Sequence, residues 1–343
     1  MKYVEKLLSA AIMGVLLFTF PSATVAQEVV LHNFVIDSVD GFQPVSGLTI
    51  DSQGNLFGTT ISGGSLNFGG TVFELSPTSD GGWTEKVIHD FNGSGRGSDG
   101  YQPNAGLISD GKGNLYGTTS SGGTRFTAGG SPIPYGTVFE VSPASDGSWT
   151  ETILYSFGAS ATDGATPYGS LVFDAKGNLY GTTQEGGTGG RYGTVFELTP
   201  VEDGSWTEKV GYSFGATNTD GIKPLAGLVI DSAGNLYGTT ALGGLYSDGY
   251  TYGGTVFELT PLGDGSWTEK ILHSFNPPQG DGSVPVANLL LDSKGNLYGT
   301  TETGGAGNVG TVFELSPADG GTWSEKVFNL YTSSSSGYDP KPA

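Results

Sequence analysis

Short apolar segments separated by turn residues recur along the chain from about residue 28 onward. The clearest is the motif GNLYGTT, which stands at 113–119, 177–183, 234–240 and 295–301, with the variant GNLFGTT at 54–60. The five copies begin 59, 64, 57 and 61 residues apart. A fixed period of this kind is the signature of a repeat architecture built from one supersecondary unit.

Each period contains four segments that are rich in strand-forming residues. An apolar segment such as GLVID comes first, and NLYGTT follows after an Asp-x-x-Gly-Asn spacer that predicts a tight hairpin turn. The third segment is GTVFEL. The fourth is WTEKVIHDF at 83–91, with close copies that begin at Trp149, Trp206, Trp267 and Trp323. Each repeat is therefore predicted to be a four-stranded antiparallel meander.

An isolated meander leaves both apolar faces in water, so the units must pack on one another. Four strands and about 60 residues per unit favour propeller blades over a β-solenoid. The predicted fold is an all-β propeller with five blades; a six-bladed ring and an incompletely closed ring are the alternatives. The segment EVVLHNF at 28–34 resembles a sixth copy of the fourth strand, and we expect it to help seal the ring.

The N-terminus has the form of a secretory signal peptide. Lys2 and Lys6 precede an uncharged apolar run, and cleavage is expected after Ala26. We expect a signal peptide at 1–26 and one propeller domain at 27–343. The repeats are placed at about 35–91, 92–157, 158–214, 215–275 and 276–331, with a tail at 332–343. The protein is thus expected to be exported to the periplasm or the medium, with no transmembrane segment after cleavage.

Composition narrows the possible partners. The formal net charge is −20, from 34 acidic and 14 basic residues, so nucleic acid is not expected as a partner. The absence of cysteine excludes disulfides and thiolate metal sites. We expect neither a cofactor nor a metal ion. The sequence does not predict the oligomeric state.

The pattern GNLYGTT…GG…GTVFEL resembles the GloVer tandem repeat of "choice-of-anchor" bacterial exported proteins, and it covers essentially the whole mature chain. The segment GLVIDSAGNLYGTT is also similar to NHL-type propeller repeats. The resemblance implies export and a propeller-like repeat. It implies no catalytic residue, and the chain shows no C-terminal anchor of the kind after which that family is named.

Polar residues that recur in every repeat are expected to build the frame. We expect the glutamates of the third strand to pair with lysines of the fourth, as Glu74 with Lys86. The turn aspartates, such as Asp51, are expected to cap their turns. His32, His89 and His273 share a position held elsewhere by Tyr155 and Tyr212. This exchange indicates a packing site with a polar tip, with the three histidines on different blades.

Binding residues are expected where the repeats differ, in the loops that follow each GTT. Two of these loops are long and aromatic, at 120–135 and 241–253. Aromatic rings with a polar edge suit sugars and peptides alike. The candidate ligand-binding residues are Arg125, Phe126, Tyr135, Arg191, Tyr192, Tyr246, Tyr250 and Tyr252. No catalytic residue is identified.

Three functions fit this sequence. The first is an exported, non-catalytic binding or scaffold propeller whose ligand is an extracellular glycan or a protein surface. The second is a carbohydrate-active enzyme, a glycoside hydrolase or lyase, with an asymmetric site of paired carboxylates at the central channel. The third is a structural protein of the cell envelope. Convergent, non-repeated Asp or Glu at the channel would favour the enzyme.

Overall fold

The computed structural model describes residues 29–36, 39–66, 68–93, 99–124, 135–188, 191–247, 252–263 and 265–328. The expected signal peptide at 1–26 lies outside them. All five repeats belong to one compact unit, His32–Ala343, and the three described residues before it belong to a separate unit, Met1–Leu31.

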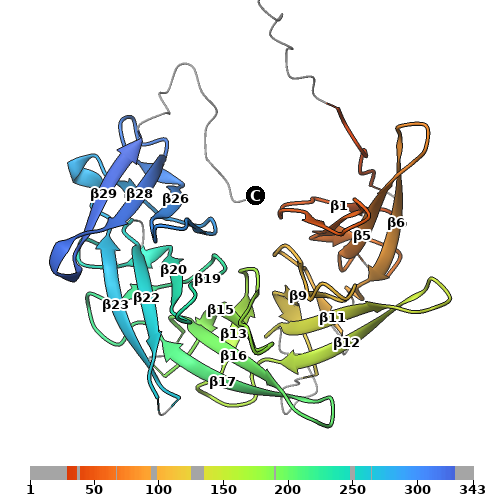
Figure 1. Ribbon diagram of the computed structural model, residues 1–343, viewed down its shortest axis with the longest axis horizontal. Helices are drawn as coiled ribbons and strands as arrows, with labels where there is room; N and C mark the ends of the chain where they lie inside the picture. Colours follow the sequence, from red (N-terminus) through yellow and green to blue (C-terminus); the bar gives the residue numbers. More distant parts are fainter. Residues whose placement is uncertain are drawn as a thin grey trace, which may run out of the picture. The chain divides into compact units, whose positions relative to one another are not determined.

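The described residues form the five four-stranded antiparallel blades of a β-propeller, as predicted (Figure 1). The first blade is β2 (Thr49–Ile50), β3 (Leu56–Thr60), β5 (Thr71–Pro77) and β6 (Trp83–Asp90). The second is β8 (Ile108–Ser109), β9 (Leu115–Thr119), β11 (Thr137–Pro143) and β12 (Trp149–Ser156). The third is β14 (Val172–Phe173), β15 (Leu179–Gly186), β16 (Thr194–Pro200) and β17 (Trp206–Ser213). The fourth is β19 (Val229–Ile230), β20 (Leu236–Thr240), β22 (Thr255–Pro261) and β23 (Trp267–Ser274). The fifth is β25 (Leu290–Leu291), β26 (Leu297–Thr301), β28 (Thr311–Pro317) and β29 (Trp323–Phe328).

Short two-stranded ladders join the loops before and after these strands, where the sequence predicts only loops. They are β1 (Gly41–Phe42) with β4 (Ser62–Gly63), β7 (Gly100–Tyr101) with β10 (Ser121–Gly122), β18 (Gly221–Ile222) with β21 (Leu242–Gly243), and β24 (Gly282–Ser283) with β27 (Thr303–Gly304). In the third blade β13 (Gly164–Pro167) pairs directly with β15. Two 3-10 turns, η1 (Pro277–Gln279) and η2 (Asp319–Gly321), complete the elements.

The turn between the first two strands of each blade is held by its aspartate, as predicted. In the first blade Asp51 Oδ1 accepts the backbone N–H groups of Gln53 and Asn55, both at 2.9 Å, and Oδ2 accepts the Asn55 side-chain amide at 2.8 Å. Gly54 lies at φ +86°, a conformation that favours glycine. The repeated Asp-x-x-Gly-Asn is therefore a structural turn.

In the third blade each residue of the Gly-Thr-Thr has a structural role. A Cβ on Gly181 would lie 2.5 Å from the ring of Phe196, so only glycine fits. The next residue, Thr182, donates to the Ala226 carbonyl of the following blade at 2.8 Å. The second threonine, Thr183, shares a buried 2.7 Å hydrogen bond with Thr194 of the neighbouring strand. The motif thus links strands within a blade and also links one blade to the next.

The hydrophobic core lies between blades. Each cluster of buried side chains joins two consecutive repeats, as Phe57 and Val72 of the first blade join Leu107 and Phe139 of the second. At the end of the outer strand in each of the first four blades, a phenylalanine also packs edge-on against the next blade. Phe91 meets Phe139 with ring centroids 5.1 Å apart. Each blade is therefore stabilised mainly by its neighbours.

The N-terminal copy of the outer strand is not a strand among the described residues, yet it keeps the contacts of that position. Phe34 meets Phe73 of the first blade edge-on at 5.1 Å, and His32 Nε2 lies 3.2 Å from Asp40 Oδ2. These contacts do not cover the first strand of the first blade. Leu48, just before that strand, is 50% exposed, whereas Leu107, its counterpart in the second blade, is 4% exposed.

The first strand of each blade is shorter than the sequence predicts, with only two ladder residues. Just before this strand, the backbone bonds to the preceding blade and not to its own sheet. In the second blade, for example, the Ala105 carbonyl accepts a hydrogen bond from the Thr59 hydroxyl of the first blade at 2.9 Å. No helix among the described residues is long and apolar enough to cross a membrane.

The threonine links between blades can be tested with a matched pair. Thr182 and Thr239 are equivalent and both 1% exposed, but Thr182 bonds to Ala226 while Thr239 Oγ1 has no partner among the described residues. Thr182→Val should lower the free energy of unfolding by about 1–3 kcal/mol, because it leaves a buried carbonyl unpaired. Thr239→Val should be nearly neutral or stabilising. Equal losses in urea unfolding would contradict this assignment.

Candidate functional site

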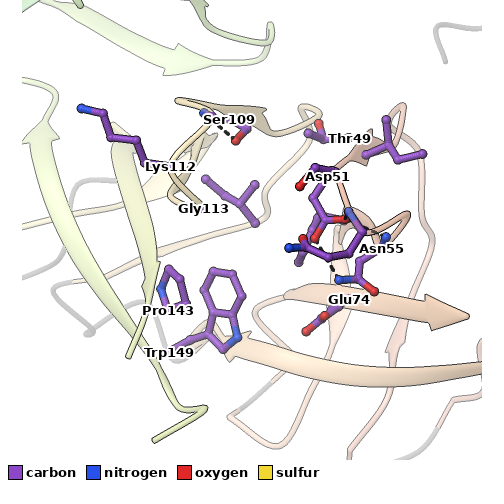
Figure 2. Close-up of a pocket in the computed structure, with 15 residues that line it drawn as sticks. Thr49, Asp51, Asn55, Glu74, Ser109, Lys112, Gly113, Pro143 and Trp149 are labelled. Carbon is purple, nitrogen blue, oxygen red and sulfur yellow. Dashed lines mark hydrogen bonds between the residues drawn. The ribbon is translucent and has the colours of Figure 1, made fainter. Parts of the chain in front are cut away.

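A groove lies between the first two blades, on the face that carries the Asp-x-x-Gly-Asn turns. Its volume is about 540 Å³, within the range of small-ligand pockets. Figure 2 shows Asp51, Asn55 and Glu74 of the first blade on one side, and Trp149 and Pro143 of the second blade on the other. An indole next to carboxylate and amide oxygens is a surface that suits ligands with both apolar and hydroxyl groups.

The elements that form the groove hold its side chains firmly. Asp51 is fixed by the turn hydrogen bonds described above, and Glu74 projects from the centre of β5. Trp149 begins β12 and meets Phe57 edge-on, with centroids 5.9 Å apart. Thr49 donates to the Leu107 carbonyl and joins the two blades at the base. The exposed Lys112 stands at the rim.

The equivalent junction between the third and fourth blades forms a smaller groove, of about 330 Å³. There Tyr180 takes the position of Phe57, and its hydroxyl donates to Glu197 at 2.9 Å. Tyr180 also packs edge-on against Trp267, at 5.7 Å. The larger groove thus occurs at the blade whose motif reads GNLFGTT.

The tyrosine hydroxyls of this position are buried among carboxylates, which makes them hard to ionise. Burial, together with Glu140 and Asp110, raises the pKa of Tyr116 to about 12. Burial also raises the pKa of Tyr237, whose hydroxyl lies 3.1 Å from both Asp231 Oδ2 and Glu258 Oε1. A phenol that keeps its proton serves these pairs of carboxylates as a donor.

The glutamates of the third strand in each blade form their hydrogen bonds with groups other than the lysines of the fourth strand. Glu74 and Lys86 are opposite one another in the ladder, as expected. The Lys86 ammonium, however, donates to the Gly147 carbonyl of the next blade at 2.8 Å, and Glu74 accepts the Ser76 hydroxyl at 3.1 Å. Glu140 and Glu314 accept a serine hydroxyl in the same way, and Glu197, Glu258 and Glu314 accept from the motif tyrosine. The predicted cross-strand pairing is therefore confirmed for the ladder positions, while the Lys86 ammonium bonds to the next blade.

A second pocket, of about 340 Å³, is lined by all five blades. It gathers the residue that follows the repeated proline in each blade, and this residue differs from copy to copy: Val45, Asn104, Tyr168, Leu225 and Val286. Among the described residues that line it, none is Asp or Glu. The described lining therefore lacks the paired carboxylates that a glycoside hydrolase of the expected kind requires.

Each junction also holds a polar cluster, in which the equivalent histidines and tyrosines take part. Tyr212 donates from its hydroxyl towards Asp220 and Glu269, at 3.1 Å from each. His273 Nε2 lies 2.9 Å from Asp281 and 3.6 Å from Glu325 of the next blade. His89 and His273 thus belong to different junctions, as predicted, and His273 lies between two carboxylates. The polar tip of His32 contacts Asp40.

Two of these clusters could hold a metal ion by geometry. The potential ligand atoms of His89, Asp99 and Glu151 lie within 4.8 Å of one another, as do those of His273, Asp281 and Glu325. Tyrosine forms the same bridge at two other junctions, which identifies the position as a structural polar link. Burial lowers the pKa of His89, so its neutral form is favoured.

The predicted loop residues are only partly described, because Arg125, Phe126 and Tyr250 lie outside the described residues. Tyr135 and Tyr192 pack on backbone glycines of the adjoining loops. A Cβ on Gly158 would meet the Tyr135 ring, and one on Gly215 would meet Tyr192. Tyr246 and Tyr252 are 45% and 36% exposed, and Arg191 is exposed at φ +89°. None of these lines the groove.

Sequence reasoning missed the groove, although one signal was present. The motif differs among its copies at a single letter, Phe57 in place of tyrosine, and that position lies at the groove. The meaning of this difference depends on the two carboxylates that surround the position, and only the folded blade brings them together.

The comparison with protein families agrees with the repeat architecture. Residues 125–342 match the model of the family described as Gloeobacter/Verrucomicrobia repeat. No curated protein matches the chain. PorZ of Porphyromonas gingivalis, an essential bacterial surface component of the type-IX secretion system, is similar with a TM-score of 0.46 and 14% identity. The match covers 87% of this chain, which spans only 38% of that protein. The neuraminidase-like protein of A/flat-faced bat/Peru gives a TM-score of 0.36 at 10% identity, over 85% of this chain and 93% of that one.

The junction carboxylates predict how stability depends on pH. Burial and the nearby Asp99 raise the pKa of Glu151 to about 8, and burial raises those of Glu208, Glu269 and Glu325 to about 7, from an ordinary value of 4.5. The folded state therefore binds these protons more tightly than the unfolded state. Their contribution is complete below about pH 4.5 and is lost as the pH rises through 7 to 8.

We expect the melting temperature to fall between pH 6 and pH 9. Glu151→Gln, which imitates the protonated acid, should flatten this decline, whereas Glu202→Gln at an exposed turn should leave it unchanged. Thermal unfolding followed by circular dichroism measures both. A decline equal to that of the wild type in Glu151→Gln would show that this carboxyl is ionised in the fold.

Proposed function

The chain belongs to the Gloeobacter/Verrucomicrobia repeat family, and we propose that it is an exported, non-catalytic binding propeller. Its ligand is an extracellular glycan, and its binding site is the groove between the first two blades. The blades supply a rigid frame, and the site lies where the first blade departs from the repeat. Export rests on the signal-peptide form of residues 1–26.

One observation carries the proposal: the groove between the first two blades combines an aromatic wall with fixed hydrogen-bonding groups. Trp149 and Phe57 supply apolar surface that can face the C–H groups of a sugar ring. Asp51, Asn55 and Glu74 supply the polar groups that would orient its hydroxyls. Because these groups are held by turns and strands, little conformational entropy is lost on binding.

The other functions have less support in the described residues. A glycoside hydrolase needs two convergent carboxyl groups with different environments. Among the described residues that line the pocket shared by all five blades, the central pocket, there is neither Asp nor Glu. The loop face that carries Arg191, Tyr246 and Tyr252 is a second proposed surface for a glycan or protein, and it is included in the test below. A scaffold in the cell envelope would need no ligand groove.

Glycan binding can be measured by calorimetry with the neutral hexasaccharides cellohexaose, maltohexaose and mannohexaose. We expect Trp149→Ala to weaken binding of the preferred one by tenfold or more, because it removes the aromatic wall. Trp267→Ala, at the equivalent position of the smaller groove, is the matched control and should bind as the wild type does.

Two results would overturn the proposal. Failure of the wild type to bind any of the three glycans would refute the function. Loss of binding in Tyr246→Ala, with normal binding in Trp149→Ala, would move the site to the loop face.

A further inference from the structure

In the third, fourth and fifth blades the hydroxyl of the motif tyrosine lies within hydrogen-bond distance of a pair of carboxylates, the turn aspartate and the strand glutamate. Tyr237 lies 3.1 Å from both of its acceptors, Asp231 and Glu258. Tyr298 lies 3.3 Å from Asp292 and 3.4 Å from Glu314. The turn aspartate and the strand glutamate are thus built to receive one hydroxyl group between them.

The first blade keeps the two acceptors and lacks the donor. Phe57 stands opposite Glu74 in the ladder, as Tyr237 stands opposite Glu258, so the ring occupies the same place without its oxygen. Asp51 keeps its turn contacts, and among the described residues Ser76 is the one side chain that donates to Glu74. Both carboxylates line the groove.

We propose that a hydroxyl group of a neutral pyranose ring takes the position of the missing tyrosine hydroxyl and donates to the Asp51–Glu74 pair. This inference rests on the proposed function and specifies the ligand chemistry of the same site. The apolar face of the sugar lies towards Trp149, which already packs edge-on against Phe57. The ligand thereby completes the hydrogen-bond arrangement that the other blades complete with their own side chain.

A neutral ligand fits this pocket better than a cation. Three N–H groups, those of the Gln53 and Asn55 backbone and the Asn55 side chain, already donate to Asp51. These neutral donors stabilise the carboxylate and occupy most of its acceptor positions. The exposed Lys112 at the rim adds a positive charge next to the site. What remains is hydrogen-bond acceptor capacity between apolar rings, which matches a sugar hydroxyl.

The decisive variant is Phe57→Tyr, which restores the hydroxyl that the other blades carry. It should occupy the acceptor pair, raise the melting temperature and weaken binding of the preferred hexasaccharide by tenfold or more. Tyr237→Phe makes the reverse change in the fourth blade; it should lower the melting temperature and leave binding at the first groove unchanged. Wild-type affinity should vary little between 50 mM and 500 mM salt, because screening acts on charged ligands.

The outcomes separate the two proposals. If Phe57→Tyr is folded and binds as tightly as the wild type while Trp149→Ala has lost binding, the hydroxyl replacement is wrong and the glycan site stands. If neither variant affects binding, the groove is not the site and both proposals fail. A lower melting temperature in Phe57→Tyr, or a strong loss of affinity with salt, would also overturn the inference.

Discussion

Burial between neighbouring blades is the constraint on which the rest of the structure depends. A four-stranded meander has two apolar faces, and no single repeat can cover both. At each of the four described junctions between blades a phenylalanine packs edge-to-face on the next blade, as Phe91 does on Phe139. At three of them a threonine hydroxyl also bonds to the next blade's backbone, as Thr182 does. The most invariant letters of the repeat are those that make these junctions.

This constraint distinguishes the residues that stabilise the blades from those that can form a specific binding site. A residue that secures every junction cannot vary without loss of stability, so a specific site must come from positions where one copy differs. Phe57 is such a position. Losing one tyrosine hydroxyl leaves the ring packing against Trp149 intact and leaves two carboxylates directed at open space. A single oxygen atom thereby distinguishes a structural junction from a proposed binding groove.

Much of the frame could be predicted from the sequence. The Asp-x-x-Gly-Asn turns, the four-stranded blades and their number follow from local patterns, since turn chemistry and strand periodicity act over a few residues. The partners of Glu74 and Lys86 could not be predicted, because Lys86 reaches Gly147, 61 residues away. The groove was also missed, since its two walls come from different repeats. The length of the loops after each GTT led to a predicted site that includes Phe126, Tyr250 and Tyr135. Phe126 and Tyr250 lie outside the described residues, and Tyr135 packs on Gly158.

The most direct test of the central claim is a crystal structure of the mature protein with a bound neutral oligosaccharide. The account predicts a sugar ring beside Trp149, with one hydroxyl oxygen within hydrogen-bond distance of both Asp51 and Glu74. Ligand density at the central pocket or on the loops after each GTT, with the groove between the first two blades filled by water alone, would contradict it.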